Sequence, residues 1–399
     1  MIDEAASLST ETLLVRASEL VLRVGDADKL QIETPDGCFA IAPLALGVLA
    51  AFEHPARLGD VLSQFEARGP EHFIEASSAV VQLHRAGVLH EPGARAAARM
   101  EHFVSPSIQA SMLADPARTN GYLTALRTLV RPNDVVLDIG TGTGILATCA
   151  ALAGARRIYA IESSGIATAA ARVFDANRVN VELFRERSTR VTLPERATLL
   201  VTEIIGNEPF HEDILEVVED ARCRLLTSDA RIIPSRIEVF AVPVDISREL
   251  LGAHAFLPED LETHRKAYGV DLSPLVSHRI PPTQPILLSA AEASSLVRAG
   301  DPAMIVDVDL QASFETRQER TVTAALTRAT KHLGVLVAFR ATLAPGNTLA
   351  PSLFEIDPLT SWRLPLWPAW DHLALPAGTR IAVDYRYVAG RTTLHVRPA

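Results

Sequence analysis

Residues 135–146, Val-Val-Leu-Asp-Ile-Gly-Thr-Gly-Thr-Gly-Ile-Leu, decide the fold. The first five residues predict a buried strand, and Gly140, Gly142 and Gly144 predict a sharp turn after it. The apolar residues 146–155 predict a helix that begins directly after the turn. A strand, a glycine turn and a helix in this order are typical of ligand sites in parallel α/β sheets. The first helical turn there offers free backbone N–H groups to an anionic group.

Three further residues indicate which ligand the turn binds. A dinucleotide fingerprint has glycine at its sixth position, and the sixth position here is Ile145. Asp138 precedes the turn, where a diphosphate gains nothing from a negative charge but a cationic sulfonium tolerates it. Glu162 ends the next predicted strand, where an acid binds two ribose hydroxyls. Together these residues favour S-adenosylmethionine, with S-adenosylhomocysteine as the product.

The surrounding pattern predicts a doubly wound parallel sheet. From residue 104 to 234, predicted strands alternate with predicted helices. The strands are 135–139, 157–161, 181–185 and 198–202, and the helices include 146–155 and 166–177. We therefore expect a Rossmann-like α/β domain at 101–234.

Different patterns precede and follow this segment. After Pro234 the chain is rich in strands, which predicts a β-barrel or sandwich-like domain at 235–399; the strands are 237–243, 303–310, 334–341, 380–387 and 392–396. The first 93 residues predict a small α+β domain like a winged helix, with strands at 20–24, 29–33 and 39–42 and helices at 43–52, 58–67 and 71–86. Residues 91–99 resemble a linker.

Bulk composition narrows the class of protein. With 399 residues, 48% of them hydrophobic, the chain can bury more than one core. Its net charge of −10 disfavours nucleic acid as a partner. The cysteines, Cys38, Cys149 and Cys223, match neither a zinc site nor a disulfide framework, so we expect no metal and a reducing cytoplasm. No segment resembles a signal peptide or a membrane span.

From about His102 to the C-terminus, the sequence resembles the protein arginine methyltransferases. Glu203 and Glu212 match that family's paired glutamates in placement and spacing. Residues 249–272 lie where the family has a dimerisation arm, so the resemblance implies a homodimer. The other matching stretches are 112–119 (Met-Leu-Ala-Asp-Pro-Ala-Arg-Thr), 140–146, 153–155, 159–162 (Tyr-Ala-Ile-Glu), 231–234 (Arg-Ile-Ile-Pro), 331–339 and 365–367 (Pro-Leu-Trp).

The resemblance implies roles for individual residues. Glu203 and Glu212 would grip a guanidinium in a bidentate fashion and help to remove its proton, which a poorly nucleophilic arginine requires. Arg118 would bind the carboxylate of the cofactor. Phe103, Met112 and Trp367 would contact the substrate. The remaining cofactor contacts would be Met112, Asp138, Gly140, Thr141, Gly142, Gly144, Ile145, Leu146, Glu162, Ser163, Thr189 and Glu203.

Several positions depart from the family's pattern. Phe103 stands where the family has tyrosine, and Thr189 aligns with a glutamate near the adenine. Leu366, in Pro365-Leu366-Trp367, aligns with the histidine of the Thr-His-Trp motif, so we expect Asp115 to lose its usual partner. The acceptor could then be another side chain, a backbone nitrogen or a modified residue.

The acidic loop also has a plainer interpretation. Glu212 could lie on a solvated helix face with Glu208 and Asp213, as an isolated glutamate usually does. Glu203 is harder to explain in this way, because it directly follows an apolar strand, and ligands bind at the C-terminal ends of such strands. His211 could act as a base, although a single loop histidine is usually solvated.

Residues 12–92 resemble the PqqD-like leader-peptide recognition domains of peptide natural-product biosynthesis. The stretches that carry this resemblance are 30–33, 39–49 and 73–89. Such domains bind an extended peptide as an added strand. The alternatives are a packing or dimerisation appendage and a DNA-binding winged helix. The last is disfavoured because residues 71–86 contain Arg85 as their single residue of full positive charge.

The sequence therefore predicts an S-adenosylmethionine-dependent N-methyltransferase acting on a peptide or protein. The most specific form of the prediction is an arginine-type side chain in a ribosomally made precursor peptide that the N-terminal domain recruits. Two alternatives remain. The enzyme could methylate another peptide nucleophile or a small molecule, or the chain could be a catalytically inactive binding protein that keeps the fold.

Overall fold

A computed structural model of the chain describes residues 8–16, 21–24, 30–34, 37–85, 88–91, 105–277, 279–280, 284–370, 374–388 and 390–399. Residue contacts divide it into two compact units, Met1–His102 and Phe103–Ala399. We call them the N-terminal unit and the C-terminal unit and describe each by itself. Most of the predicted linker, residues 92–99, lies outside the described residues.

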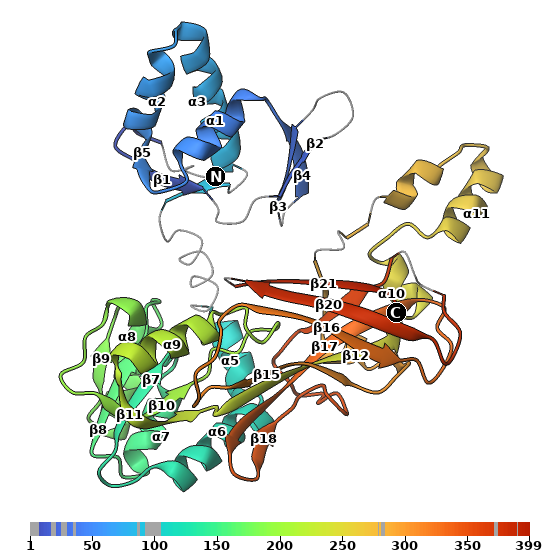
Figure 1. Ribbon diagram of the computed structural model, residues 1–399. Helices are drawn as coiled ribbons and strands as arrows, with labels where there is room; N and C mark the ends of the chain where they lie inside the picture. The colour runs from blue at the N-terminus through green and yellow to red at the C-terminus, as the bar shows by residue number, and fades with distance from the viewer. Residues whose placement is uncertain are drawn as a thin grey trace. The chain divides into compact units, whose positions relative to one another are not determined.

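The N-terminal unit is a small α+β structure (Figure 1). The antiparallel strands β2 (Val21–Val24), β3 (Leu30–Thr34) and β4 (Gly37–Ile41) form one sheet, followed by the helices α1 (Leu44–Ala51), α2 (Leu58–Glu66) and α3 (Pro70–Arg85). These elements confirm the predicted order of strands and helices. A second sheet was not predicted, because its strands are too short to show periodicity: β1 (Leu13–Arg16), β5 (Ala56–Arg57) and β6 (Leu89–His90).

The C-terminal unit begins with a five-stranded parallel sheet in the order β11-β10-β7-β8-β9. This confirms the doubly wound α/β prediction. The strands are β7 (Val135–Ile139), β8 (Arg157–Ile161), β9 (Glu182–Phe184), β10 (Ala197–Thr202) and β11 (Leu226–Ile233). The connecting elements are α5 (Pro106–Leu113), α6 (Pro116–Leu129), α7 (Ile145–Leu152), α8 (Ala167–Asn177), the 3₁₀ turn η2 (Ser188–Arg190) and α9 (Ile214–Arg224).

The strand order locates the site. Successive strands run outward from β7 to β8 and β9, and the chain then returns to place β10 on the other side of β7. In open α/β sheets, ligands bind beyond the carboxyl ends of the two strands that flank such a reversal. The reversal here lies between β7 and β10, and Asp138 and Glu203 stand at or directly after the ends of these strands.

The remainder of the C-terminal unit is built from antiparallel strands, which confirms the predicted strand-rich segment, and we call it the β-rich part. One sheet has the order β13-β19-β17-β12-β14, with β15 paired to β12 and β18 to β17, and a second sheet has the order β16-β20-β21. The strands are β12 (Arg236–Asp245), β13 (Ile286–Leu288), β14 (Val297–Arg298), β15 (Ala303–Asp309), β16 (Gln318–Ala325), β17 (Leu333–Ala344), β18 (Asn347–Leu349), β19 (Leu364–Pro368), β20 (Arg380–Val388) and β21 (Arg391–Pro398).

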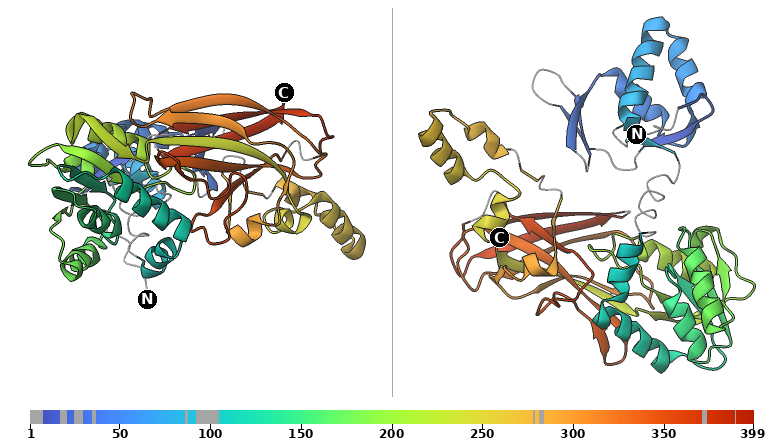
Figure 2. Two further views of the ribbon diagram at one scale, coloured as in Figure 1. Left: turned by 90° about the horizontal axis from the view of Figure 1, so that it is seen from below. Right: turned by 180° about the vertical axis from the view of Figure 1, so that it is seen from behind.

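Short helices interrupt these strands. They are α10 (Arg248–Gly252), α11 (Pro258–Tyr268), η3 (Ser273–Ser277) and α12 (Ala290–Ala293). Figure 2 shows α11 projecting from the β-rich part in both views. Exposed apolar side chains lie on and beside this projection, among them Tyr268 and Val270.

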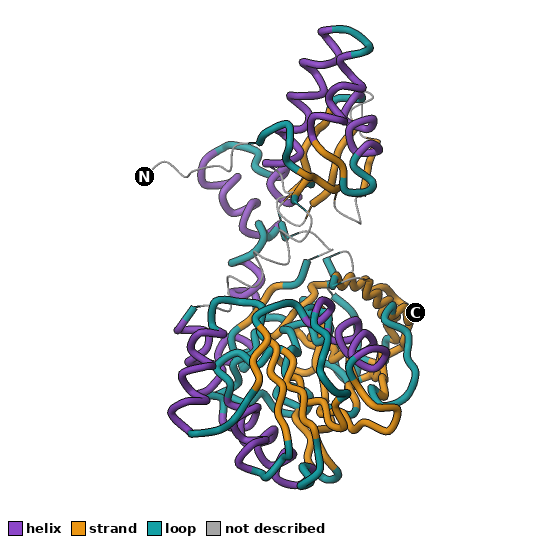
Figure 3. Tube along the Cα trace, turned by 90° about the vertical axis from the view of Figure 1, so that its left-hand side faces the viewer, coloured by secondary structure: helices purple, strands orange, loops and turns teal. Residues whose placement is uncertain are grey.

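One core joins the parallel sheet to the β-rich part. Buried side chains from β7, β10, β12, β17 and β20 belong to a single apolar cluster. The Phe210 and Tyr387 rings lie 5.4 Å apart, and Asn347 Nδ2 donates to the carbonyl oxygen of Gly121 at 2.8 Å. Figure 3 shows helices of this unit along one side of a body made mostly of strands. The two parts can therefore present side chains to one site.

Candidate active site

The glycine turn after β7 is held by two acidic side chains. Asp138 is fully buried; its Oδ2 accepts from Thr141 Oγ1 at 2.5 Å and from the backbone N–H of Ala147 at 3.0 Å. Glu162 Oε2 accepts from the N–H of Gly142 at 2.9 Å. Gly142 has a φ of +55°, in the left-handed region that favours glycine. The structure therefore brings Asp138, Gly142 and Glu162 together, as the sequence predicts.

Burial makes Asp138 an unusual carboxyl. Loss of hydration raises its pKa to about 7, although Thr141 and Ala147 lower it by hydrogen bonding. Its second oxygen, Oδ1, is buried and accepts no hydrogen bond in the described part of the chain. A buried acceptor without a donor suits a ligand that brings an ammonium or a hydroxyl group.

Arg118 lies in the first turn of α6 and is the centre of the second half of the site. Its guanidinium forms an ion pair with Glu203, and the two side chains are 14% and 8% exposed. The guanidinium also lies 5.0 Å from the ring centroid of Trp362 and donates to Ser361 Oγ at 3.2 Å. Burial lowers the pKa of Arg118, while the neighbouring Tyr122, Glu212 and Asp115 raise it.

The two paired glutamates therefore act on one guanidinium. Glu203 contacts Arg118 directly, and the negative charge of Glu212 is near enough to raise the pKa of Arg118. Glu203 Oε1 is buried and accepts no hydrogen bond among the described residues, so that oxygen is available to a further donor. The loop after β10 thus carries one carboxylate that contacts the Arg118 guanidinium and a second whose charge raises the pKa of Arg118.

The structure corrects the predicted partner of Asp115. Leu366 and Trp367 lie in β19, where they are 0% and 2% exposed, so this segment belongs to the core. Asp115 Oδ2 instead accepts from the backbone N–H of Ser361 at 2.9 Å and from its Oγ at 3.2 Å. Asp115 has therefore not lost its partner, and the expectation drawn from Leu366 is wrong.

The segment that sequence reasoning missed is Thr360-Ser361-Trp362. It has the outer two residues of the Thr-His-Trp motif, with serine at the centre, and it contacts both Asp115 and Arg118. The Thr-x-Trp spacing was the signal that could have identified it. The Pro365-Leu366-Trp367 segment attracted the alignment because it also ends in tryptophan, five residues later.

Glu208 also differs from expectation. The alternative interpretation of the loop placed it on a solvated face, but it is 4% exposed, and burial raises its pKa to about 7. Glu212 is half-buried and His211 is exposed. The plain interpretation of this loop as a solvated helix face is therefore wrong for Glu208. Phe103 lies outside the described residues.

The other predicted positions lie on the elements around the turn. Thr141 and Leu146 are buried, and Ile145 and Met112 are half-buried, Met112 on α5. Ser163 directly follows Glu162 and is exposed. Thr189 is exposed on η2. No contact of the described residues tests the ligand roles of these side chains, and they stay predictions.

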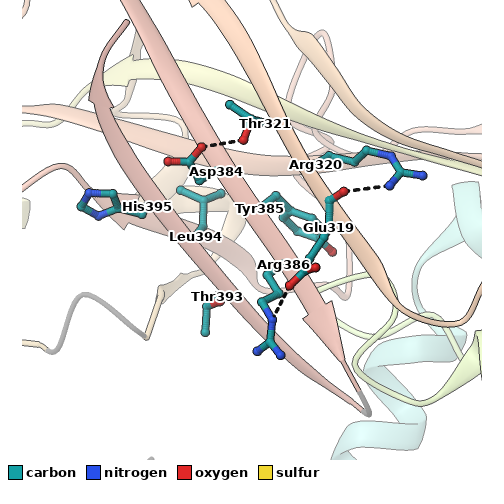
Figure 4. Close-up of a pocket in the computed structure, with 9 residues that line it drawn as sticks. All are labelled: Glu319, Arg320, Thr321, Asp384, Tyr385, Arg386, Thr393, Leu394 and His395. Carbon is teal, nitrogen blue, oxygen red and sulfur yellow. Dashed lines mark hydrogen bonds and ion pairs between the residues drawn. The ribbon is translucent and has the colours of Figure 1, made fainter. Parts of the chain in front are cut away.

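Further features of the described residues give no second site. A depression lies on the second sheet of the β-rich part, and its two acidic side chains already have partners: Glu319 pairs with Arg386 and Asp384 with Thr321, each at 2.7 Å (Figure 4). Within the described ranges, no group of three or more His, Cys, Asp and Glu side chains could hold a metal ion. None of the helices described is long and apolar enough to cross a membrane.

The comparison with family models indicates the class of protein, a methyltransferase. Residues 116–237 match the family model described as ribosomal protein L11 methyltransferase (PrmA). These residues include the glycine turn, Arg118 and both paired glutamates.

Curated relatives narrow the similarity. The chain is 34% identical over 172 residues to protein arginine N-methyltransferase 6 of Danio rerio. The aligned stretch covers 42% of this chain and 48% of the relative. It is 39% identical over 145 residues to protein arginine N-methyltransferase 7 of Drosophila persimilis (33% and 21%). It is 32% identical over 210 residues to the probable histone-arginine methyltransferase CARM1 of Oryza sativa subsp. indica (51% and 36%). The chain thus spans less than half the length of these relatives.

Solved structures show the fold. The Trypanosoma brucei PRMT1 enzyme–prozyme heterotetrameric complex with AdoHcy matches 74% of this chain and 95% of its own, with a TM-score of 0.60 and 22% identity. Arabidopsis thaliana protein arginine methyltransferase 10 matches the same share with a TM-score of 0.56 and 20% identity, covering 99% of its own chain. The predicted combination of a parallel sheet and a strand-rich part is therefore the fold of these arginine methyltransferase structures.

Proposed function

We propose that this protein is an S-adenosylmethionine-dependent methyltransferase whose acceptor is a guanidinium nitrogen of a peptide or protein. The observation that carries the proposal is the ion pair between Glu203 and the guanidinium of Arg118, with Glu212 near enough for its charge to raise the pKa of Arg118. A loop that already holds one guanidinium has the charge and shape for another. The arginine methyltransferase relatives and the shared fold support the same acceptor.

The residues of the glycine turn fit the cofactor. The left-handed Gly142 lets the backbone turn sharply, and Asp138 Oδ1 is a buried acceptor for a ligand donor. Arg118 would bind the methionine carboxylate, and Glu162 the ribose hydroxyls. The bound cofactor supplies an electrophilic methyl group. The AdoHcy of the trypanosomal structure supports this assignment.

The chain's own contribution is to place and deprotonate the acceptor. Methyl transfer is an in-line displacement, so a correct approach of the nitrogen supplies most of the acceleration. Glu203 Oε1 can accept from one N–H of the acceptor while Glu212 accepts from another. Two acceptors on one side draw positive charge away from the reacting nitrogen and can take its proton.

Ser361 gives limited support to an acceptor other than an ordinary arginine. Serine carries no charge at the position of the motif's histidine, so this side of the site is less polar than the resemblance implied. The acceptor could then be a modified arginine, another nitrogen or a small molecule. The trypanosomal complex joins an enzyme to a prozyme, and an inactive binding partner is the second rival.

We propose that the N-terminal unit recruits the substrate. Its three-stranded antiparallel sheet is followed by three helices, which suits addition of a peptide as a further strand. Ile74 and Val81 on α3 are exposed apolar side chains available to such a peptide. The substrate would be a ribosomally made precursor peptide, and the enzyme would work in the cytoplasm as a homodimer formed through α11.

The test is transfer of a labelled methyl group. The intact protein is incubated with methyl-labelled S-adenosylmethionine and pooled peptides that contain arginine, and with matched pools in which lysine replaces arginine. The proposal expects label in the arginine pool, released as methylarginine after acid hydrolysis. Label in both pools alike, or in a peptide without arginine, would favour another nucleophile. Binding of NAD in place of S-adenosylhomocysteine would overturn the class.

A further inference from the structure

Glu208 stands between the paired glutamates, and its side chain enters the β-rich part. It is 4% exposed. Its neighbours come from three strands of the β-rich part: Trp367 of β19, Tyr385 of β20 and Thr392 of β21. We call these four residues the Glu208 cluster. The cluster has no part in the chemistry proposed above for the acceptor.

The cluster brings together buried polar atoms that lack hydrogen-bond partners among the described residues. Five atoms are buried and form no hydrogen bond among the described residues: both carboxyl oxygens of Glu208, Trp367 Nε1, the Tyr385 hydroxyl and Thr392 Oγ1. Thr392 and Trp367 are nevertheless close enough to lower the pKa of Glu208 as hydrogen-bond donors, and Tyr385 is close enough to respond to its charge. One buried carboxyl therefore has the donors of Thr392 and Trp367 beside it, from two strands, and the Tyr385 hydroxyl responds to its charge.

The charge of the cluster follows from its surroundings. Burial raises the pKa of Glu208 to about 7 in spite of its donors, and burial keeps Tyr385 neutral by raising its pKa well above 10. The next titratable pair outward is Tyr387 of β20 with Glu216 of α9, joined at 3.0 Å. Among the described residues, no Lys, Arg or His acts on the pKa of Glu208. An apolar residue of equal size would avoid the cost of burying the acid.

The loop residues on either side of Glu208 are also attached to the β-rich part and to the segment that directly precedes β19. The carbonyl oxygen of Ile205 accepts from Trp362 Nε1 at 2.8 Å, and Asn207 Oδ1 accepts from the N–H of Arg363 at 2.7 Å. The ring of Phe210 packs on Tyr387. The contacts of Glu208 lie in the middle of this series. Removing them would leave Asn207 and Ile205 as the polar attachments of the loop.

The backbone at Glu208 connects the anchor to Glu212. The carbonyl oxygen of Glu208 accepts from the N–H of His211 at 2.9 Å, which closes the turn before Glu212. A Cβ added at Gly206 would lie 2.8 Å from that same carbonyl oxygen, so the loop is wound tightly here. A shift of Glu208 must therefore move its neighbours in the loop.

We propose that Glu208 is a positioning residue that fixes the loop to the β-rich part, so that Glu203 and Glu212 face one guanidinium. This role rests on the proposed function. A misplacement of about 1 Å in a catalytic group can cost about a hundredfold in rate, so such an anchor affects turnover without touching the acceptor. Glu208→Gln keeps the shape and an acceptor for Thr392 and Trp367. Glu208→Leu keeps the approximate volume and removes both carboxyl oxygens that face the Thr392 and Trp367 donors.

The first test is hydrogen exchange of the intact protein, read by mass spectrometry on peptides that cover residues 203–212. The loop amides should exchange about tenfold or more faster in Glu208→Leu, and close to the wild-type rate in Glu208→Gln. Thr392→Val removes one donor from the opposite side and should act in the same direction more weakly. Glu219→Gln, on the exposed side of α9, is the matched control and should change nothing. Equal exchange in wild type and both cluster variants would overturn the anchor.

The second test is kinetic. Glu208→Leu should lower kcat by about tenfold or more with little change in the affinity for S-adenosylhomocysteine, and Glu208→Gln should restore most of the rate. Unchanged kcat in Glu208→Leu together with fast loop exchange would show that the loop's position does not matter for turnover, which contradicts the proposal. If the wild-type protein transfers no methyl group, the proposed function fails, while the exchange experiment still tests the anchor. If Glu208→Leu does not fold, Thr392→Val provides both measurements.

Discussion

Arg118 shows how much of the site depends on single side chains. Its guanidinium contacts Glu203, Ser361 and the face of Trp362, which come from two segments far apart in the sequence. The resemblance identified Arg118 and Glu203 separately, but no pattern in the sequence shows that they meet. A carboxylate of the bound cofactor would compete with Glu203 for this cation, which would leave Glu203 to the acceptor.

The glycine turn gives the first prediction. Gly142→Val should abolish binding of S-adenosylhomocysteine in calorimetry, because a β-branched residue is strongly disfavoured at a φ of +55° and its side chain would enter the turn. Gly154→Val is the matched control. Gly154 also has a left-handed φ, +95°, but lies after α7 with no atom within 4 Å of an added Cβ. It should be strained in the same way and bind normally. Unchanged affinity in Gly142→Val would refute the assignment of the cofactor site.

At the scale of elements, continuous apolar runs were the strongest guide. The strands β7 and β8 have the predicted bounds, because central parallel strands are buried on both faces. The strands β11, β16 and β19 were missed. β16, Gln-Glu-Arg-Thr-Val-Thr-Ala-Ala, is largely polar because one face meets solvent, and β19 contains two prolines. The position of Thr360-Ser361-Trp362 against Asp115 depends on tertiary packing, so sequence spacing alone did not locate it.

The loop between β10 and α9 gives a prediction about pH. Because the pKa of Glu208 is raised from 4.5 to about 7 by burial, its contribution to stability is fully present below pH 4.5 and is lost as the pH rises through 7. Relative to wild type, Glu208→Gln should therefore gain stability between pH 5 and pH 7.5, by up to roughly 3 kcal/mol. Denaturant unfolding of both proteins at several pH values measures this difference.

The comparison isolates Glu208 from the other acids whose pKa values burial raises. Asp138 also has a raised pKa, but it is present in both proteins and its effect cancels in the difference. Glu219→Gln changes an exposed acid on the neighbouring helix and should run parallel to wild type at every pH. A constant difference between wild type and Glu208→Gln would mean that Glu208 ionises in the folded protein as it does in the unfolded chain.

At the scale of the whole molecule, the two units allow recruitment and chemistry to be separated. Each unit has its own buried core. A chain that begins near Glu101 should bind S-adenosylhomocysteine and methylate short arginine peptides as the full chain does. On a complete precursor peptide, it should lose kcat/KM mainly through a higher KM. Equal kcat/KM of the two proteins on the precursor would refute recruitment by the N-terminal unit.

The paired glutamates allow the most direct test of the central claim, that two carboxylates hold a guanidinium for methylation. Glu203→Gln keeps the shape of the side chain and removes its charge. Loss of one charge-assisted hydrogen bond should lower kcat/KM about ten- to a hundredfold, equivalent to about 1.5–3 kcal/mol, without weakening the binding of S-adenosylhomocysteine. Glu212→Gln should behave alike, and Glu219→Gln is the control.

The measurement is the rate of methylarginine formation by the wild-type protein, the two single variants and the double variant. We predict a large loss in each single variant and a less than additive loss in the double variant, because both carboxylates act on one group. Full turnover in both single variants would contradict the account, since the acceptor would then not be held by these carboxylates.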